Sequence, residues 1–154
     1  MELSKKERDL ILRLDTKGPD EPSVCNIVQN KSGEEYVSTL SWKKNGAFVT
    51  RPNNAPNNIV YNDKGQILSQ SWCESNGGNG LYDEYMHNTY GAGCIFTIEI
   101  NGEMKERYFY YLKGVNQNEK IEKFIKENNI DSNYVTGKEL ERDILELYLL
   151  NYGS

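Results

Sequence analysis

His87 is the only histidine of the chain, and it follows Asp83 by four residues and Glu84 by three. An imidazole beside two carboxylates is the combination that general acid–base catalysis or a metal site would use. One histidine does not make a His-rich metal site, however, and no CxxC pair accompanies it. We therefore expect a structural role for His87, and we expect no enzymatic activity, no metal and no cofactor.

Two other features have a chemical and a structural interpretation. The glycine-rich segment "ESNGGNG" at 74–80 could cradle a phosphate, but it lacks the lysine of a P-loop and suits a long turn equally well. Cys25, Cys73 and Cys94 form no paired motif. Because Cys94 begins an apolar strand, we expect reduced and mostly buried thiols rather than a nucleophile.

Aromatic side chains are the strongest candidates for binding a partner. They occur in the longest irregular segment, "ESNGGNGLYDEYMHNTY" at 74–90, and in "RYFYYLKG" at 107–114. Aromatic groups beside carboxylates suit a basic protein surface better than a nucleic acid. The alternative, that these side chains fold back to complete the core, stays open. The predicted partner-binding residues are Tyr82, Asp83, Glu84, Tyr85, Tyr108 and Tyr110.

A repeat organises the elements that would position these residues. Three similar segments align on the central glycines Gly33, Gly65 and Gly102. Ile27, Ile59 and Phe96 each precede the glycine by six residues, and an aromatic residue follows it, at Trp42, Trp72 and Phe109. Each copy alternates apolar and polar residues around an Asn/Asp/Gly turn, which predicts a β-hairpin. The anchors are expected to form two buried columns across the sheet.

Helices are expected at both ends of the array. Ser4 and Glu7 form a predicted capping box at the N-terminus, and Thr136 and Glu139 form one before the last helix. The sequence predicts an α+β fold that is mainly β: a twisted antiparallel meander sheet of about six strands from three hairpins, capped by one N-terminal and two C-terminal helices. We expect a single domain over 1–154, with a helix in 1–16, repeats at 18–46, 47–77 and 78–114, and a helical cap at 117–151.

Composition excludes several function classes. The net charge is −5, which argues against a nonspecific nucleic-acid binder and against binding to anionic membranes. The segment "MELSKKERDLILRLD" is too charged for a signal peptide, and no apolar run approaches the length of a membrane span. We expect a cytoplasmic protein. The sequence leaves its oligomeric state open.

The copies resemble the MORN-like repeats of bacterial, phage and large-DNA-virus proteins, a group that includes YwqK-type antitoxins. "WKKNG" from Trp42 is followed by "TRPNNAP" at 50–56, in which Arg51 keeps the arginine of the repeat. In "HNTYGAG" at 87–93 the histidine and a glycine remain, and Asn88 replaces the arginine. The resemblance covers about residues 20–126 and implies a binding or scaffolding sheet rather than a catalytic site.

Three hypotheses follow. The leading one is a noncatalytic interaction protein, encoded by a phage or mobile element, that binds a host cytoplasmic protein and inhibits or neutralises it. The second is a binder of a small nucleotide-like ligand, which would use the aromatic face and the glycine-rich loop. The third is a small enzyme centred on His87.

Overall fold

The computed structural model describes residues 2–76 and 83–152. The chain divides into two compact units, Met1–Glu84 and Tyr85–Ser154. The expectation of a single domain over 1–154 stays a prediction.

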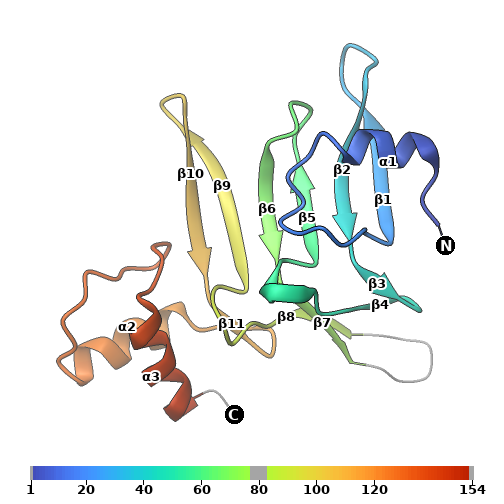
Figure 1. Cartoon of the computed structure of the whole chain (residues 1–154). Helices are drawn as coiled ribbons and strands as arrows, with labels where there is room; N and C mark the ends of the chain where they lie inside the picture. The colour runs from blue at the N-terminus through green and yellow to red at the C-terminus, as the bar shows by residue number, and fades with distance from the viewer. Residues whose placement is uncertain (1, 77–82, 153–154) are drawn as a thin grey trace. The chain divides into compact units, whose positions relative to one another are not determined.

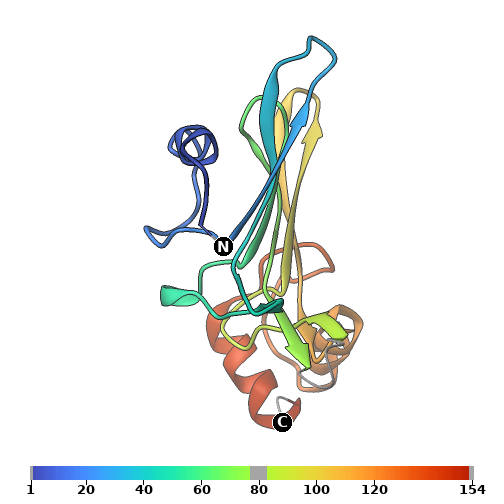
Figure 2. The ribbon, with the colours of Figure 1, turned by 90° about the vertical axis from the view of Figure 1, so that its right-hand side faces the viewer.

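The first unit holds two of the predicted hairpins, β1 (Val24–Gln29) with β2 (Glu35–Ser41) and β5 (Asn58–Tyr61) with β6 (Ile67–Ser71) (Figure 1). Their antiparallel strands follow the order β1-β2-β5-β6. Helix α1 (Lys5–Ile11) lies to one side of this sheet (Figure 2). Shorter elements follow the hairpins: β3 (Lys43–Lys44), β4 (Ala47–Phe48), the 3-10 turn η1 (Pro52–Asn54) and β7 (Cys73–Asn76).

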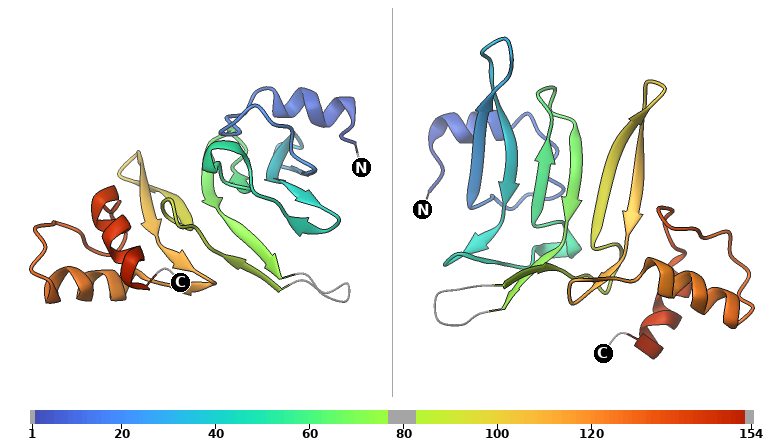
Figure 3. Two further views of the ribbon diagram at one scale, coloured as in Figure 1. Left: turned by 60° about the horizontal axis from the view of Figure 1, so that its bottom comes forward. Right: turned by 180° about the vertical axis from the view of Figure 1, so that it is seen from behind.

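The second unit holds the third hairpin, β9 (Cys94–Ile100) with β10 (Glu103–Phe109), and the small hairpin β11 (Tyr111–Leu112) with β12 (Val115–Asn116). Helices α2 (Asn118–Glu127) and α3 (Arg142–Tyr152) lie at the end of β9–β10 away from its turn (Figure 3). Strand β8 (Asp83–Met86) contains the boundary between the units. The predicted class is confirmed: an α+β fold, mainly β, with six main antiparallel strands in three hairpins.

The turns explain why the central glycines recur. Gly33, Gly65 and Gly102 have φ of 80°, 78° and 81°, a backbone conformation that a side chain disfavours. In the third hairpin Asn101 also has positive φ, at 51°, so Asn101–Gly102 forms the tight two-residue turn typical of a hairpin. The predicted hairpin repeat therefore has a local conformational cause.

The core of the first unit lies between α1 and one face of its sheet. Leu40, Ile59 and Tyr61 are 0%, 0% and 2% exposed. Leu10 and Leu14 pack against this cluster, together with Ile11. Ser4 starts α1 with the predicted capping box, in which its hydroxyl accepts from the Glu7 N–H and Glu7 accepts from the Ser4 N–H. The helix that was expected within 1–16 is thus positioned to cover the sheet.

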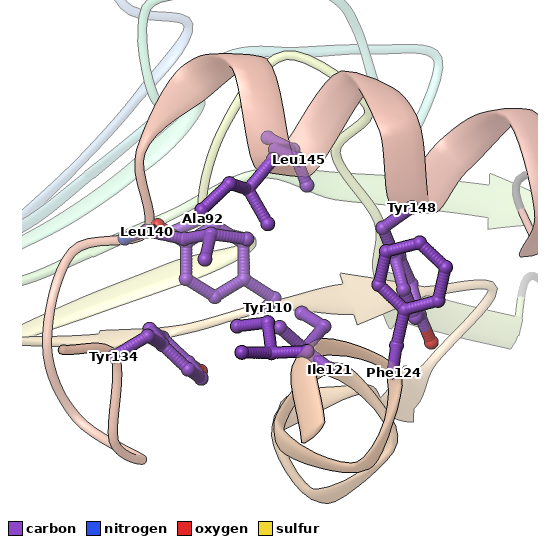
Figure 4. Close-up of a cluster of buried hydrophobic side chains, with 10 residues drawn as sticks. Ala92, Tyr110, Ile121, Phe124, Tyr134, Leu140, Leu145 and Tyr148 are labelled. Atoms are coloured by element: carbon purple, nitrogen blue, oxygen red, sulfur yellow. The ribbon is translucent and has the colours of Figure 1, made fainter. Parts of the chain in front are cut away.

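The core of the second unit lies between its helices and the end of β10 (Figure 4). The apolar stripe of α2 is buried at Ile121, Phe124 and Ile125. In α3 the buried positions are Ile144, Leu145 and Tyr148, whereas Leu147 is 45% exposed. The rings of Phe124 and Tyr148 meet edge to face at 5.5 Å.

Two sequence predictions about the repeat anchors are wrong. Trp42 is buried at 3% exposure, but Trp72 and Phe109 are only half-buried, and Phe96 is 46% exposed. The anchors therefore do not form uniformly buried columns. The structural counterpart of Trp42 in the third copy is Tyr110, one residue after Phe109.

Hydrogen bonding gives the reason for this shift. The Trp42 carbonyl accepts from Val49 N–H at 3.0 Å, and the Tyr110 carbonyl accepts from Gln117 N–H at 2.7 Å, seven residues later in both cases. Both anchors directly follow a main strand and are buried, Tyr110 at 4% exposure. The first two turns have the same length, at 30–34 and 62–66, and the third is shorter, at 101–102; the strand after the turn has 7 residues in β2 and β10 and 5 in β6. The distance from the central glycine to the residue after that strand is therefore not constant.

The predicted start of the last helix is also wrong. Helix α3 begins at Arg142, and Thr136 does not cap it: the Thr136 hydroxyl donates to Glu122 at 2.9 Å. Gly137 instead accepts a hydrogen bond from the Tyr108 N–H at 2.9 Å. The segment that was expected to begin the helix thus binds along β10, and this tertiary contact overrides the local capping signal.

Candidate functional site

The third hairpin presents an uncovered apolar stripe. Phe96, Ile98 and Ile100 alternate along β9 and are 46%, 41% and 39% exposed. Alternate residues of a strand share one face, so the three side chains lie on the same side of the hairpin. Phe96 meets Phe109 edge to face at 5.7 Å between ring centroids. A contiguous exposed apolar patch of this kind is typical of an interaction surface.

Charged side chains stand directly across from this stripe. Arg107 pairs with Phe96, Lys105 with Ile98, and Glu103 with Ile100. Directly opposed residues of an antiparallel pair point to the same face. Among the described residues, neither Lys105 nor Arg107 forms an ion pair. The face therefore combines an apolar strand with two cationic groups and one carboxylate; we call Phe96, Ile98, Ile100, Glu103, Lys105 and Arg107 the β9–β10 face.

The helices of the second unit cover the other side of the hairpin. Ile95 and Tyr108, which pair with each other, pack against the core cluster of α2 and α3, as does Leu112. Ile95 and Tyr108 alternate with Phe96 and Phe109, so they point to the opposite face. The second unit thus buries one face of β9–β10 and leaves the β9–β10 face open.

The corresponding face of the first unit is covered. Ile27 and Ile59 occupy the repeat position of Phe96, and both lie in the cluster against which α1 packs. Across from Ile27 stands Val37, buried at 4% exposure, where the third hairpin has Arg107. The same repeat position is therefore core in the first unit and surface in the second.

The predicted binding residues at 82–85 occupy several environments. Tyr82 lies outside the described residues, and so does the side chain of Asp83, although its backbone belongs to β8. The Glu84 carboxylate is exposed and accepts from the Lys43 ammonium at 3.1 Å. Tyr85 is half-buried and lies against the turn at Gly114, where an added Cβ would meet the Tyr85 Cβ at 3.0 Å. A common binding surface of these four residues stays a prediction.

Tyr108 and Tyr110 do not form an open aromatic face. Tyr108 is half-buried against the helices, and its hydroxyl bonds Glu106 at 3.3 Å. Tyr110 is a core residue: its hydroxyl accepts the Leu140 N–H at 2.7 Å, and its ring meets Tyr134 edge to face. Burial raises the pKa of Tyr110 to about 12. The expectation that Tyr110 contacts a partner is corrected here, because its side chain is already enclosed by its own chain.

His87 and Asn88 fix the loop between β8 and β9 by hydrogen bonds within the second unit. His87 Nδ1 accepts the Lys113 N–H at 2.8 Å, and the Asn88 amide donates to the Ala92 carbonyl at 2.8 Å. The described residues contain no group of three or more His, Cys, Asp or Glu side chains placed to bind a metal. The absence of catalytic activity stays a prediction. The contacts of His87 fit a structural role.

The glycine-rich segment lies largely outside the described residues, and the three cysteines do not form a site. Residues 77–80 of the segment at 74–80 lie outside the described residues, so a phosphate-binding role for it stays a prediction. Cys94 is buried at 2% exposure, while Cys25 and Cys73 are half-buried, and all three are reduced. Burial raises the pKa of the Cys25 thiol to about 11, which keeps it protonated and weakly nucleophilic.

Sequence reasoning missed a buried ionic network in the first unit. The Arg51 side chain, at 0% exposure, bonds the Asp20 carboxylate at 2.9 Å and donates to the carbonyls of Thr16 and Pro56 at 2.7 and 2.8 Å. Hydrogen bonds from Arg51 hold the pKa of Asp20 below its ordinary value. The repeat motif marked Arg51, but no signal in the sequence identified Asp20 as its partner.

A cavity of about 410 Å³ lies between α1 and the loop that leads to β1. Its wall is mostly apolar, with Arg8, Asp20 and Glu21 as the charged groups. All three are internally paired, since Arg8 bonds Glu21 at 2.8 Å and Asp20 bonds Arg51. The cavity has room for a small apolar molecule, and its carboxylates disfavour a phosphate.

Among the helices of the described residues, none is both long and apolar enough to cross a membrane. No model of a known protein family matches the chain, and neither a curated protein nor a solved structure is similar to it at a significant level. The resemblance to MORN-like repeats therefore stays a prediction, and the contacts of the molecule itself carry the functional argument.

Proposed function

We propose that the chain is a noncatalytic interaction protein, encoded by a phage or mobile element, that binds a host cytoplasmic protein and inhibits or neutralises it. The observation that carries the proposal is the β9–β10 face. Three large apolar side chains stand there in a row at about 40% exposure, although Ile27 and Ile59, at the repeat position of Phe96, belong to the apolar cluster against which α1 packs. Burial of such a stripe by a partner would remove apolar surface from water.

A comparison of two double variants tests this proposal. In Phe96→Thr with Ile98→Thr, the stripe loses its apolar character, while threonine keeps a good strand propensity. The matched control is Val24→Thr with Val28→Thr, because both valines are exposed strand residues, at 37% and 39%, in β1 of the first unit. Each tagged protein is used to capture proteins from a bacterial lysate.

We expect the wild-type chain and the control to retain the same bacterial protein and the Phe96/Ile98 variant to lose it. Circular dichroism and melting temperature check that all three chains are folded. Capture that is identical for both variants, or no protein retained by the wild-type chain above the tag alone, would contradict the proposal.

A small-ligand binder is the second candidate, and the cavity beside α1 favours it. The cavity wall argues for an apolar ligand rather than the nucleotide-like one expected from the sequence, because the charged groups that line it include two carboxylates. Native mass spectrometry of the purified protein separates the two functions. A bound small molecule that is lost in Leu14→Asp would favour ligand binding over protein binding.

A further inference from the structure

We propose that the β9–β10 face receives an amphipathic helix of the partner protein, with acidic side chains beside the apolar stripe of that helix. This inference rests on the proposed function and names the kind of surface that the partner presents. Its basis is a comparison of the third hairpin with the first two, where the equivalent face already carries a helix.

The first unit shows how the repeat accepts a helix. Leu10, Ile11 and Leu14 of α1 and its following turn pack against the cluster that contains Ile59, and Ile27 packs against the same cluster. Ile27 and Ile59 both stand six residues before the central glycine. An added Cβ on Gly65 would lie 3.3 Å from Leu14, so the contact reaches the turn of the second hairpin. Helix-on-sheet packing at this repeat position is thus a property that the fold already displays.

The third hairpin has a larger apolar strand at the same position. Phe96 replaces the isoleucine, and Ile98 and Ile100 continue the stripe, whereas the first hairpin has Gln29 and Lys31 at the two following positions. At about 3.3 Å per residue the stripe is about 13 Å long. This length corresponds to about two to three turns of helix, slightly more than α1, which has 7 residues.

The charged side chains across from the stripe favour a negatively charged partner helix. Across from the stripe stand the cations Lys105 and Arg107 and the single carboxylate Glu103, so cations outnumber anions there. At the position of Arg107 the first unit has the uncharged Val37 and Gln70, which face Ile27 and Ile59. These two cations lie on a chain whose net charge is −5. An acidic helix would neutralise them at the rim of the apolar contact, and charge complementarity at a rim mainly raises specificity and the association rate.

A second copy of the chain is a poorer occupant. Two copies that met through this face would each bring two cations, Lys105 and Arg107, and only one carboxylate, Glu103, to the contact. Each copy also carries the same net negative charge. Self-association through the face is therefore disfavoured. It is nevertheless measured directly in the experiment below.

The test uses three fluorescent peptides with the full-length chain. Each is about 18 residues long, or about five helical turns, and each carries the same leucine stripe. The residues beside that stripe are all Glu, all Gln or all Lys. Fluorescence anisotropy measures affinity at about 0.1 M salt and again at higher salt. We expect the Glu peptide to bind at least about tenfold more tightly than the Lys peptide, with a preference that falls as salt rises.

Four variants locate the binding site. Lys105→Glu should reduce or reverse the preference for the Glu peptide, and the Phe96/Ile98 threonine variant should lose binding of every peptide. Val24→Thr with Val28→Thr should bind as wild type. Arg107 lies against Gly137, where an added Cβ would meet Arg107 Nε at 2.5 Å. Arg107→Gln is therefore made separately, and its fold is checked first.

Several outcomes would overturn the inference. Equal affinity for the Glu and Lys peptides would contradict an acidic partner. Peptide binding that is unchanged by Lys105→Glu would show that the peptides bind at another site. A dimer in size-exclusion chromatography that is lost in the Phe96/Ile98 variant would assign the face to a second copy. If capture from lysate depends on Phe96 and Ile98 while the peptides show no charge preference, the interaction function stands and the acidic helix does not.

Discussion

The guanidinium carbon of Arg51 lies 3.6 Å from the ring centroid of Trp42, in a stacked cation–π contact. The Trp42 indole N–H donates in turn to the Asp20 carbonyl at 3.2 Å, and the Asp20 carboxylate binds Arg51. The three residues form a closed set of contacts that links the residue after β2 and the residue before η1 to the segment that follows α1. This set holds that segment, and with it the helix that covers the sheet.

Removal of the Asp20 carboxylate should destabilise the protein strongly. Asp20→Ala leaves the Arg51 charge buried with only carbonyl partners, and the loss of one partner of a buried pair costs about 3 kcal/mol or more. Glu21→Ala is the matched control, because its ion pair with Arg8 is half exposed and should contribute much less to stability. Urea denaturation measures both; equal effects would show that the Arg51 network is no more important than a surface pair.

The same carboxylate should make stability sensitive to acid. The pKa of Asp20 is lower in the folded chain than in the unfolded one, where it is about 3.9. Its contribution is therefore fully present above about pH 4 and is lost as the pH falls through the folded pKa. Melting temperatures between about pH 2 and pH 5 should fall less steeply in Asp20→Asn than in wild type. If the melting temperatures of the two proteins depend on pH in the same way, other carboxylates, such as Asp15, cause the acid sensitivity.

The two tryptophans should differ in their contribution to stability. Trp42 is buried at 3% exposure and stacked on Arg51, so Trp42→Ala should cost about 3–5 kcal/mol. Trp72 is half-buried, and its indole N–H donates to the Asn54 carbonyl at 2.7 Å. Trp72→Ala should therefore cost less, about 1–2 kcal/mol. Equal losses in chemical denaturation would restore the equivalence that the repeat spacing predicts.

Two buried tyrosines should respond in opposite directions to loss of the hydroxyl. The Tyr134 hydroxyl is buried and has no hydrogen-bond partner among the described residues, so Tyr134→Phe should raise the free energy of unfolding by about 1 kcal/mol. Tyr110→Phe removes the acceptor of the Leu140 N–H and should lower it by about 1–3 kcal/mol. Thermal denaturation of the pair tests this, and a destabilised Tyr134→Phe would point to a partner for that hydroxyl.

The hairpins and the first helix follow from local sequence. Positive φ at Gly33, Gly65 and Gly102 is a preference of the residues in the turn itself, and alternation along each strand sets which side chains share a face. The capping box of Ser4 and Glu7 is likewise made by residues three apart. Patterns of this kind can be recognised without knowing what the rest of the chain does.

The candidate site depends on contacts between residues far apart in sequence. The aromatic residues at 82–85 and 108–110 drew attention because of their type, yet type does not distinguish a core tyrosine from an exposed one. Tyr110 became core because Leu140, thirty residues away, donates to its hydroxyl. The start of α3 moved to Arg142 for the same reason, since Gly137 pairs with Tyr108.

Phe96 illustrates what the sequence determined and what it left to the tertiary structure. The sequence determined that Phe96 occupies the same repeat position as Ile27 and Ile59. It also determined that Phe96 shares a strand face with Ile98 and Ile100. Tertiary structure alone decided that α1 packs against the cluster of Ile27 and Ile59, whereas α2 and α3 pack on the other face of β9–β10. A strand pattern shows which residues point the same way, but burial depends on which helix docks there, and docking is set by the summed packing of distant segments.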